Sequence, residues 1–550
     1  METIADLLLA RLGDERPGLR GRERSWTWDE VVRASAVRAD VARELRRDGP
    51  FHIGVLLDNV PEYVLWLGAA ALGGATIVGI NPTRTGAYLE QEVRHTDLQL
   101  LVTDEAGAKL LDGLDIGVPR DRFLLIDSEE YAALLDRHAG AEPARDPAIT
   151  PSTQMLLLFT SGTTGASKAA RCSQGRLYGL GQANSAKYDV KRDDVSYCPM
   201  PLFHGNALMA LWAPSLYAGA CVCLAPKFSA SGFLPDVRFY GATFFTYVGK
   251  AIGYVLATPE QPDDADNTLT HGFGTEASPE DKKEFLRRFG ARLVEGYGSS
   301  EGAGMVRLAK DAPETAFGVP AHDGVRIVNP ETRETCAPAV LDEHGRVLNA
   351  EAAVGEIVDV HGAAKFEGYY KNPEADAERV RHGWYWTGDL GYLDERGFLY
   401  FAGRSGDWIR VDSENTSALQ IQLVIRRHPK VVDAVVFAVP DPRSGDQVMA
   451  AIEVPDGVAF ADLDFAAFLA AQPDLGTKGA PRFVRVSASL PTTGSGKLAR
   501  KQLQIEGWRT GDPVYRWIGR GAPAYVQMTA DDKAELRAEF AANGRLRFLP

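Results

Sequence analysis

Hydrophobic residues in this chain follow two patterns that alternate along its length. Short apolar runs rich in β-branched residues are typical of buried strands. These runs are 52–59, 99–104, 195–202, 220–226 and 242–248. Between them, apolar residues recur at helical spacing, as in 61–73 and 279–290. The alternation predicts an α/β fold in which helices cover the sheets.

The pattern changes toward the C-terminus. From Gly355 onward predicted strands are more frequent, and a run of small residues over 403–407 interrupts the elements. After this run, the spacing predicts a helix over 417–429 and strands over 433–440 and 447–455. We therefore expect a domain boundary at the small residues. The predicted parts are a large N-terminal domain over 1–403, a hinge over 404–407 and a small C-terminal domain over 408–550.

The composition is that of a globular protein. Hydrophobic residues make up 45% of the 550 residues and charged residues 24%, which excludes a disordered chain. The formal net charge of −14 argues against a protein that binds nucleic acid through a basic surface. A phosphate-bearing ligand would have to be held by a few placed groups, against the overall electrostatic field.

Cysteine usage and hydrophobic runs indicate the cellular setting. The five cysteines include no CxxC pair, so neither a disulfide framework nor a zinc site is indicated. The N-terminus lacks the basic start of a signal peptide. One long uncharged run, 63–80, is interrupted by Gly73-Gly74 and predicts a buried helix and strand. We expect a cytoplasmic protein without an integral membrane segment.

The strongest local signal is an apolar strand that leads into a loop of glycines and hydroxyl groups. Residues 155–159 are apolar, and the loop after them ends in a lysine. Glycines let backbone N–H groups approach an anion, hydroxyl groups donate to phosphate oxygens, and the lysine adds charge. Ser167 stands where a Walker A loop needs glycine. The candidate phosphate-binding residues are Thr160, Ser161, Gly162, Thr163, Thr164, Gly165 and Lys168.

A second cluster, 295–302, places an aromatic residue between glycines and beside carboxylates. The ring of Tyr297 is suited to stacking on a base. Glu301 is a candidate ligand for Mg²⁺, which prefers oxygen. By itself this cluster is a weak signal, because Gly-Tyr-Gly turns are common.

Two further clusters lie closer to the C-terminus. Residues 384–389 end in Asp389, a carboxylate suited to a vicinal diol, and Arg404 follows at a distance of fifteen residues. Residues 490–497 form a glycine-containing loop that presents Lys497. A lysine in such a loop is a stronger candidate for catalysis than for a solvated surface charge.

The clusters together resemble the adenylate-forming superfamily of acyl-CoA synthetases, luciferases and peptide-synthetase adenylation domains. The segments that carry the resemblance, in family order, are TSGTTGASK, YGSSE, YWTGD, GRSGD and TTGSGK. The likeness runs from near Asn59 to at least Lys501. Residues 412–415 and the C-terminal tail are similar to the branch of very-long-chain acyl-CoA synthetases and fatty-acid-transport proteins. Actinobacterial fatty-acid and steroid CoA ligases share this similarity. The resemblance implies the adenylate-forming fold, with a multi-sheet N-terminal domain and a small mobile α+β C-terminal domain.

The resemblance implies an enzyme that uses ATP, Mg²⁺ and coenzyme A. Glu301, together with Thr160, would hold Mg²⁺. Tyr297 would stack on adenine, Glu295 would face its amino edge and Asp389 would bind the ribose hydroxyls. The other residues implied for ATP or AMP are Gly274, Thr275, Glu276, Gly296, Gly298, Ser300, Arg404 and Lys497. The residues implied for catalysis are Lys497, Glu301, Thr160 and Arg404.

The same resemblance implies residues for the acid and for coenzyme A. The acyl pocket would be lined by His204, Tyr247, Val248, Gly249 and Gly296. The small domain would rotate about a hinge at Gly406 and Asp407, withdraw Lys497 and present Arg410. Ser413 stands where the family usually has glycine, beside the pantetheine tunnel.

Three functions remain open at this point. The first is an acid:CoA ligase for a hydrophobic acid, either long-chain or of a bulky steroid or terpenoid type. The second, favoured by Ser413, is an acyl-AMP ligase that loads a carrier protein or another acceptor. The third is a lipid-uptake or trafficking protein. The sequence does not determine which acid is used or the oligomeric state, for which a dimer is one option.

Overall fold

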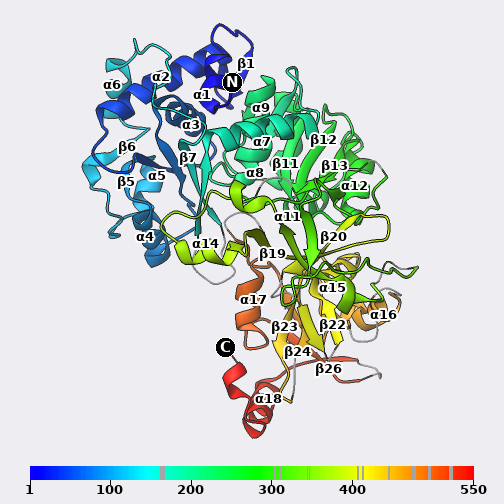
Figure 1. Ribbon diagram of the computed structural model, residues 1–550. Helices are drawn as coiled ribbons and strands as arrows, with labels where there is room; N and C mark the ends of the chain where they lie inside the picture. Colours follow the sequence, from blue (N-terminus) through cyan, green and yellow to red (C-terminus); the bar gives the residue numbers. More distant parts are fainter. Residues whose placement is uncertain are drawn as a thin grey trace. The chain divides into compact units, whose positions relative to one another are not determined.

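The structure is a computed structural model of residues 1–550. It describes all residues except 161–167, 303–304, 310, 344, 346, 405–407, 412–413, 444–445, 473–474, 476–478, 494–496, 520–523 and 550, and it describes only the backbone of 404, 408, 410–411 and 414–417. The chain forms two compact units (Figure 1). The first unit comprises Met1–Glu276, Lys282–Ala303 and Ala364–Val380, and the second comprises the rest. The predicted domains over 1–403 and 408–550, joined by a hinge over 404–407, stay a prediction.

The first unit contains a seven-stranded sheet with the order β13-β12-β11-β9-β10-β1-β2. All neighbouring strands are parallel except β2, which runs antiparallel to β1. Parallel strands buried on both faces are typical of α/β proteins. The strands are β1 (Pro17–Arg20), β2 (Ser25–Thr27), β9 (Val195–Cys198), β10 (Cys221–Leu224), β11 (Phe244–Val248), β12 (His271–Thr275) and β13 (Arg292–Glu295).

The second sheet of the first unit has six strands in the order β6-β5-β3-β4-β7-β8. Its strands are parallel except for β8, which pairs antiparallel with β7 and so forms a hairpin at the edge of the sheet. The strands are β3 (His52–Leu56), β4 (Thr76–Gly79), β5 (Leu98–Thr103), β6 (Phe123–Leu125), β7 (Gln154–Thr160) and β8 (Lys168–Ser173). The turn of this hairpin is the predicted phosphate-binding loop.

Helices cover the two sheets of the first unit. Figure 1 shows α7 and α9 on one side of β11 and β12, and α12 on the other. The helices are α1 (Ile4–Leu9), α2 (Trp28–Glu44), α3 (Pro61–Gly73), α4 (Gly86–His95), α5 (Glu105–Leu110), α6 (Glu129–Arg137), α7 (Gln174–Lys187), α8 (Gly205–Ala207), the π-helix η2 (Leu208–Trp212), α9 (Ala213–Ala218), α10 (Ala230–Tyr240), α11 (Gly249–Leu256), most of α12 (Pro279–Phe289) and α14 (Pro373–Arg379).

Helix α3 shows how the sequence specifies one of these elements. Proline occupies its first turn, where no N–H is needed, and Gly74 ends it with a left-handed backbone at φ 72°. Every residue from Tyr63 to Gly73 is buried. The predicted buried helix and the strand after it, β4, are therefore confirmed. Among the helices in the described part of the chain, none has the length and hydropathy that crossing a membrane requires.

The second unit consists mainly of antiparallel sheets. One five-stranded sheet has the order β23-β24-β25-β26-β27, and apolar residues of α15 pack against β23 and β24 in one core. The strands are β14 (Val306–Arg307), β15 (Val319–Pro320), β16 (Val325–Val328), β17 (Gly355–Asp359), β18 (Val380–Arg381), β19 (Trp384–Leu393), β20 (Leu399–Arg404), β21 (Trp408–Val411), β22 (Glu414–Ser417), β23 (Asp433–Pro440), β24 (Asp446–Glu453), β25 (Phe483–Ser487), β26 (Val514–Trp517) and β27 (Tyr525–Gln527). The helices are α13 (Ala350–Ala353), α15 (Ala418–Arg426), α16 (Phe465–Ala470), α17 (Arg500–Glu506) and α18 (Ala530–Ala542).

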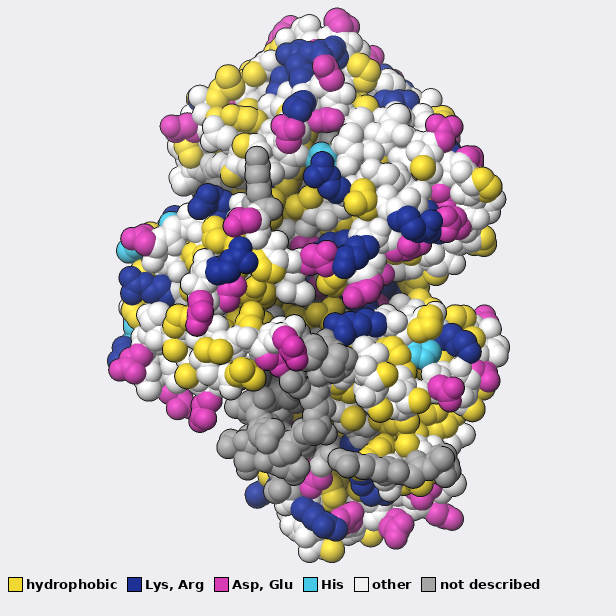
Figure 2. All heavy atoms as spheres, turned by 90° about the vertical axis from the view of Figure 1, so that its right-hand side faces the viewer, with side chains coloured by type: hydrophobic (Ala, Val, Ile, Leu, Met, Phe, Trp, Pro, Cys, Tyr) yellow, Lys and Arg dark blue, Asp and Glu magenta, His cyan; other side chains and the backbone are white. Residues whose placement is uncertain are grey.

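The structure confirms the α/β prediction and its helix-strand-strand order after the small-residue run. Strands β23 and β24 fall within two residues of the predicted ranges, and helix α15 begins one residue after the predicted start and ends three residues before the predicted end. The acidic balance of the chain does not produce a surface of one sign on the face in Figure 2, where basic and acidic side chains are interspersed.

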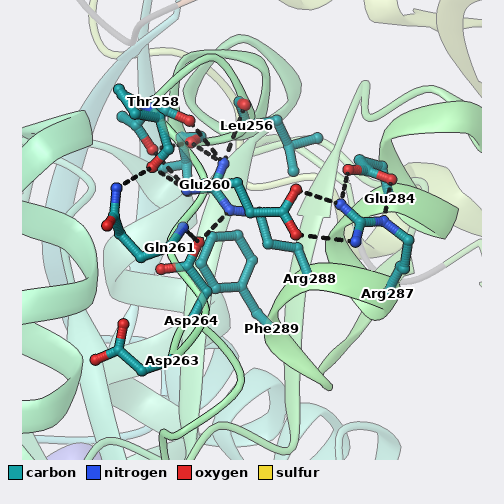
Figure 3. Close-up of polar contacts among 12 residues, drawn as sticks. Leu256, Thr258, Glu260, Gln261, Asp263, Asp264, Glu284, Arg287, Arg288 and Phe289 are labelled. Carbon is teal, nitrogen blue, oxygen red and sulfur yellow. Dashed lines mark hydrogen bonds and ion pairs between the residues drawn. The ribbon is translucent and has the colours of Figure 1, made fainter.

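A buried ion pair ties α12 to the loop after α11 (Figure 3). The guanidinium of Arg288 donates to the Asp264 carboxylate at 2.5 Å, and the two side chains are 4% and 3% exposed. The same guanidinium donates to the carbonyls of Leu256 and Thr258. A buried charge with this many partners is stabilising only while all of them are present.

Removal of the Arg288 guanidinium should therefore destabilise the protein. Arg288→Leu leaves Asp264 buried and unpaired, and we expect the free energy of unfolding to fall by about 3–5 kcal/mol. The measurement is urea denaturation. Arg287→Leu is the matched control, because that neighbouring side chain is 53% exposed and pairs with Glu260 and Glu284 at the surface; its loss should be much smaller. Equal losses in the two variants would contradict the role given to the buried pair.

The stability difference between wild type and Arg288→Leu should depend on pH, because Asp264 is the ionisable partner of Arg288. Burial alone would raise the pKa of this carboxyl, but the Gln261 backbone N–H and Arg288 outweigh it and lower the pKa below its ordinary value of 3.8. A lowered pKa in the folded state contributes stability above the unfolded pKa and loses it as the pH falls through the folded one. The stability difference between wild type and Arg288→Leu should shrink as the pH falls below about 4.

Candidate active site

The carboxyl ends of three parallel strands bring predicted site residues of the first unit together. In the register of the sheet, Val248 lies opposite Thr275, and Gly274 lies opposite Glu295. In open α/β sheets, ligands bind outside the carboxyl ends of the strands. Segments 247–249, 274–276 and 295–297, which are far apart in the sequence, therefore meet at one edge.

Glycines in β12 make room for aromatic rings from β11. A Cβ atom on Gly272 would lie 2.5 Å from the Phe245 ring, and one on Gly274 would lie 2.4 Å from the Tyr247 carbonyl and 2.5 Å from its ring. Because the ring lies over Gly274, the Tyr247 hydroxyl reaches the next strand and donates to Glu295 Oε1 at 2.8 Å. Glycine at 274 is thus required by packing as well as by any ligand.

Glu295 is held at both carboxylate oxygens. Oε1 accepts the Tyr247 hydroxyl, and Oε2 accepts the backbone N–H of Glu276 at 2.8 Å. Glu276 has a left-handed backbone at φ 74°, which is uncommon for a residue other than glycine and is associated with functional sites. Tyr247, predicted for the acyl pocket, directs its hydroxyl to Glu295 and is 1% exposed; its place in the pocket stays a prediction.

The two ends of the predicted phosphate loop lie side by side on the hairpin. Thr160 pairs with Lys168 across β7 and β8, and the Lys168 side chain is buried to 8% exposure. Its ammonium group pairs with Glu378 of α14 at 2.9 Å. The residues between them, Ser161, Gly162, Thr163, Thr164 and Gly165, lie outside the described part of the chain.

Glu301 is buried beside a tyrosine that the sequence analysis did not identify. The Tyr369 hydroxyl donates to Glu301 Oε1 at 3.1 Å and accepts from Arg379 Nε at 3.1 Å. The Lys168 ammonium lies 5.5 Å from the centroid of the same ring. Residues from 364–380 therefore complete the surroundings of Glu301 and Lys168. The signal that could have indicated Tyr369 is the segment GYYKNP over 368–373, which contains two adjacent tyrosines.

The segment around His204 approaches the YGSSE turn. A Cβ atom on Gly205 would lie 2.7 Å from Ser300 Oγ, and the Arg176 guanidinium donates to the Ser300 carbonyl at 2.6 Å. His204 is half-buried, with its ring centroid 5.4 Å from that of Phe203. The π-helix η2 begins directly after α8; single π-helical turns are frequent at functional sites.

The other predicted residues of the first unit differ in exposure. Val248 and Gly249, where β11 passes into α11, are buried, as is Gly296 after β13. A Cβ atom on Gly296 would lie 2.5 Å from the Phe273 ring. Tyr297 is half-buried and Gly298 is exposed with open space around it.

The second unit carries the remaining predicted residues. Asp389 in β19 lies opposite Arg404 in β20 in the antiparallel register, so the two backbones are adjacent. The Thr493 backbone N–H donates to the Lys497 carbonyl at 2.6 Å, which closes the lysine loop at its base. Arg410 in β21 pairs with Asn415 in β22. Gly406, Asp407 and Ser413 lie outside the described residues.

The donor set near Glu301 fits a magnesium ion carried in with a phosphate ligand. Mg²⁺ is usually bound by one or two carboxylates together with substrate phosphates, in contrast to a cage made entirely of protein groups. One carboxylate, Glu301, lies beside the predicted phosphate loop with its Oε1 occupied by a single hydroxyl. Within the described ranges, no group of three or more His, Cys, Asp and Glu residues is suited to a metal.

Comparison with known families and proteins identifies two matching regions. Residues 10–370 match the family described as AMP-binding enzyme, and residues 420–497 match the AMP-binding enzyme C-terminal domain. The steroid-22-oyl-CoA synthetase of Rhodococcus jostii (strain RHA1) is 66% identical over 547 residues, covering 100% of this chain and 99% of that protein. The medium/long-chain-fatty-acid–CoA ligase FadD17 of Mycobacterium tuberculosis is 41% identical over 515 residues, covering 93% and 98%.

Solved structures agree on the fold. The anthranilate CoA ligase AuaEII, in complex with anthranoyl-AMP, has a TM-score of 0.80 at 18% identity, covering 91% of this chain and 96% of that one. A benzoate CoA ligase from Burkholderia xenovorans LB400 has a TM-score of 0.78 at 19% identity, covering 92% and 100%. The predicted adenylate-forming fold is confirmed.

The close packing at Gly274 can be tested by adding one methyl group. Gly274→Ala forces the Tyr247 ring and carbonyl to move, and we expect the free energy of unfolding to fall by about 1–3 kcal/mol, as for other overpacked sites. Gly298→Ala is the control, since a Cβ atom there meets nothing within 4 Å. Chemical denaturation of both variants gives the comparison. A Gly274→Ala protein as stable as Gly298→Ala would show that the ring adjusts without cost.

Proposed function

The chain belongs to the AMP-binding enzyme family, and from this premise we propose that it is an acid:CoA ligase that activates a hydrophobic carboxylic acid of steroid or fatty type. The observation that carries the proposal is the full-length, 66% identical relative named steroid-22-oyl-CoA synthetase. The fatty-acid–CoA ligases at 41% identity support the same reaction with another acid. Between the two classes, the higher identity favours a steroid acid.

The reaction has two half-reactions. In the first, a carboxylate oxygen of the acid attacks the α-phosphorus of ATP, which forms acyl-AMP and releases pyrophosphate. In the second, the thiolate of coenzyme A attacks the acyl carbon, which forms the thioester and releases AMP. The first step makes the carboxyl carbon electrophilic by giving it a good leaving group. Negative charge develops on the phosphates in that step, so the protein must place cations and hydrogen-bond donors there.

The groups on the phosphate side are those of the β7–β8 hairpin and its neighbours. We assign the loop from Thr160 to Lys168 to the β- and γ-phosphates. Mg²⁺, held by Glu301 and Thr160, would neutralise developing phosphate charge. Tyr369 fixes the Glu301 carboxylate through the 3.1 Å hydrogen bond. Lys168 is oriented by Glu378, which is 60% exposed and can therefore give up the lysine to a phosphate at little desolvation cost.

The nucleoside would be read at the carboxyl ends of β12 and β13. We assign Tyr297 to stacking on adenine and Glu295 to its amino edge. Because Tyr247 and Glu276 already donate to Glu295, this carboxylate is fixed before a ligand arrives. Asp389 would bind the ribose hydroxyls and Arg404 the ribose–phosphate side, together with Gly274, Thr275, Gly296, Gly298 and Ser300.

Lys497 and the small domain would separate the two half-reactions. We propose that Lys497 bridges the acyl carboxylate and the α-phosphate during adenylation. Rotation about Gly406 and Asp407 would then withdraw this lysine and present Arg410 for the thiol step. The acid would lie along His204, Tyr247, Val248, Gly249 and Gly296.

Ser413 favours a second candidate function. A side chain at this position would narrow the tunnel for pantetheine, so the acyl group could pass to a carrier protein or another acceptor. The test is a pyrophosphate-release screen over fatty, aromatic, steroid and diterpenoid acids, followed by addition of coenzyme A to the best acid. Thioester formation supports the ligase. Acyl-AMP that accumulates and gives no thioester overturns it in favour of another acceptor.

Because we assign Lys497 to adenylation, its removal should slow the first half-reaction and spare the second. Lys497→Ala should slow pyrophosphate release about a hundredfold or more but leave thioester formation from supplied acyl-AMP near the wild-type rate. Both rates are measured by quenched-flow assays. Lys501→Ala, an exposed lysine in the adjacent helix α17, should retain both activities. Equal losses in the two half-reactions of Lys497→Ala would contradict the rotating-domain account.

The role of the Tyr369 hydroxyl can be tested by comparison with that of the adjacent Tyr370. Tyr369→Phe removes the hydroxyl that positions Glu301 and binds Arg379, and we expect kcat/KM for Mg·ATP to fall about tenfold, with a shift of the Mg²⁺ dependence to higher concentration. The control is Tyr370→Phe, which removes a hydroxyl that donates to Asp97 at 2.6 Å. If both variants show the same Mg²⁺ dependence, Tyr369 has only a structural role.

A further inference from the structure

Two buried polar atoms beside the presumed acyl pocket have no hydrogen-bond partner among the residues that the structure describes. They are Oγ1 of Thr246 and Oδ1 of Asn206, and Thr246 is 0% exposed. The amide nitrogen of Asn206 donates to the Tyr247 carbonyl at 3.2 Å, which fixes the orientation of the amide and leaves its oxygen as the unsatisfied atom. Buried polar atoms without partners are rare and costly, and each requires an explanation.

Both atoms belong to the same layer of the first unit. Side chains alternate across β11, so Thr246 shares a face with Phe244 and Val248. Those two residues pack in one hydrophobic cluster with Leu208 and Met209 of η2. Asn206 lies in α8, directly before this π-helix, and its amide reaches β11. The unsatisfied oxygens therefore lie in the layer between β11 and the α8–η2 segment that begins after His204.

A lysine supplies a third polar group on this face. Lys187 ends α7, and its ammonium lies 5.7 Å from the ring centroid of Phe273 and 5.6 Å from that of Tyr188. It is 3.6 Å from the position that a Cβ atom on Gly296 would take. Burial lowers the pKa of Lys187. In the part of the chain that the structure describes, no carboxylate lies within ion-pair distance of this ammonium, although aromatic rings surround it.

The three groups differ from the apolar wall around them in one respect: each has hydrogen-bonding capacity that the described part of the chain leaves unused. We propose that Lys187, Thr246 and Asn206 form a polar subsite of the acyl pocket that binds an oxygen substituent, a ketone or a hydroxyl, on the hydrophobic part of the acid. This inference rests on the proposed function and narrows its substrate to an oxygenated polycyclic acid. Lysine donates to a ketone or hydroxyl oxygen, and the Asn206 and Thr246 oxygens accept from a hydroxyl.

The chemistry explains why a rigid, oxygenated acid fits better than a plain alkyl chain. A flexible chain that passes these atoms leaves them without partners, and their desolvation is not offset. A fused-ring acid holds its oxygen at a fixed distance from its carboxylate, so the subsite and the reaction centre are engaged together without further ordering. A site built to bind a substrate oxygen also discriminates strongly against the analogue that lacks it.

The stability of the free protein gives the first test. Thr246→Val removes a hydroxyl without a partner, so the melting temperature should stay the same or rise. Thr103→Val is the matched control, because Thr103 is equally buried but donates to the Leu56 carbonyl at 2.9 Å; this variant should melt at a lower temperature. If Thr246→Val is destabilised as much as Thr103→Val, the Thr246 hydroxyl has a structural partner and the subsite is wrong.

Selectivity gives the second test. Pyrophosphate release is measured with cholanoic acid, which has no ring oxygen, and with its hydroxy and oxo derivatives. Wild type should prefer at least one oxygenated acid over cholanoic acid by about tenfold or more in kcat/KM. Lys187→Met should reduce this preference about tenfold for the oxo acid, and Thr246→Val should reduce it for the hydroxy acid. Lys191→Met removes the same charge from an exposed position and should keep the preference.

The outcomes separate the inference from the function on which it rests. Equal activity of wild type on cholanoic acid and on every oxygenated derivative overturns the subsite, as does an unchanged preference in Lys187→Met and Thr246→Val. Activity confined to fatty acids also overturns the subsite but leaves the ligase intact. If neither fatty nor polycyclic acids release pyrophosphate, the proposed function fails and the subsite fails with it.

Discussion

The site depends on one constraint, the parallel register of β11, β12 and β13. This register sets three chain segments at one sheet edge, and it works only because β12 has glycine where β11 has aromatic rings. The Tyr247 ring crosses Gly274 and its hydroxyl holds Glu295 at 2.8 Å. A larger residue at 274 would separate the strands or displace the ring. The position of Glu295 is therefore a consequence of sheet packing, established before any nucleotide binds.

The acidic chain handles a polyanionic substrate by local means. Lys168 is buried at the start of β8, opposite the last residue of β7, and its partner Glu378 is mostly exposed. Glu301 is likewise buried and is fixed by a neutral hydroxyl. In the proposed site, each charge assigned to the phosphates is thus positioned by a weakly competing partner, so binding of ATP would exchange contacts without stranding a buried ion. This arrangement reconciles a net charge of −14 with recognition of phosphates.

The sequence predicted local elements and motifs well, because their signals are local. The runs that form β11 and α15 are specified by residues close together in the chain. It did not reveal Tyr369, Glu378 or Arg379, since their contacts with Glu301 and Lys168 depend on the path of the chain through the fold. Nor did it reveal that Tyr247 serves Glu295, because the direction of a side chain depends on strand register. The sequence likewise does not indicate the surroundings of Lys187, because Phe273 and Gly296, which lie beside it, are far away along the chain.

The first unit is built from three separate segments of the chain, and this has a consequence for biosynthesis. Its last piece, Ala364–Val380, follows sixty residues that belong to the second unit, and its Tyr369 pairs with Ala170 at the edge of the hairpin. A ribosome delivers the chain from the N-terminus, so the sheet edge beside β8 is left open while residues 304–363 are made. Until Tyr369 emerges, the nascent enzyme has its phosphate loop but lacks the side chain that positions Glu301. Completion of the catalytic centre is thereby delayed until most of the polypeptide has left the ribosome.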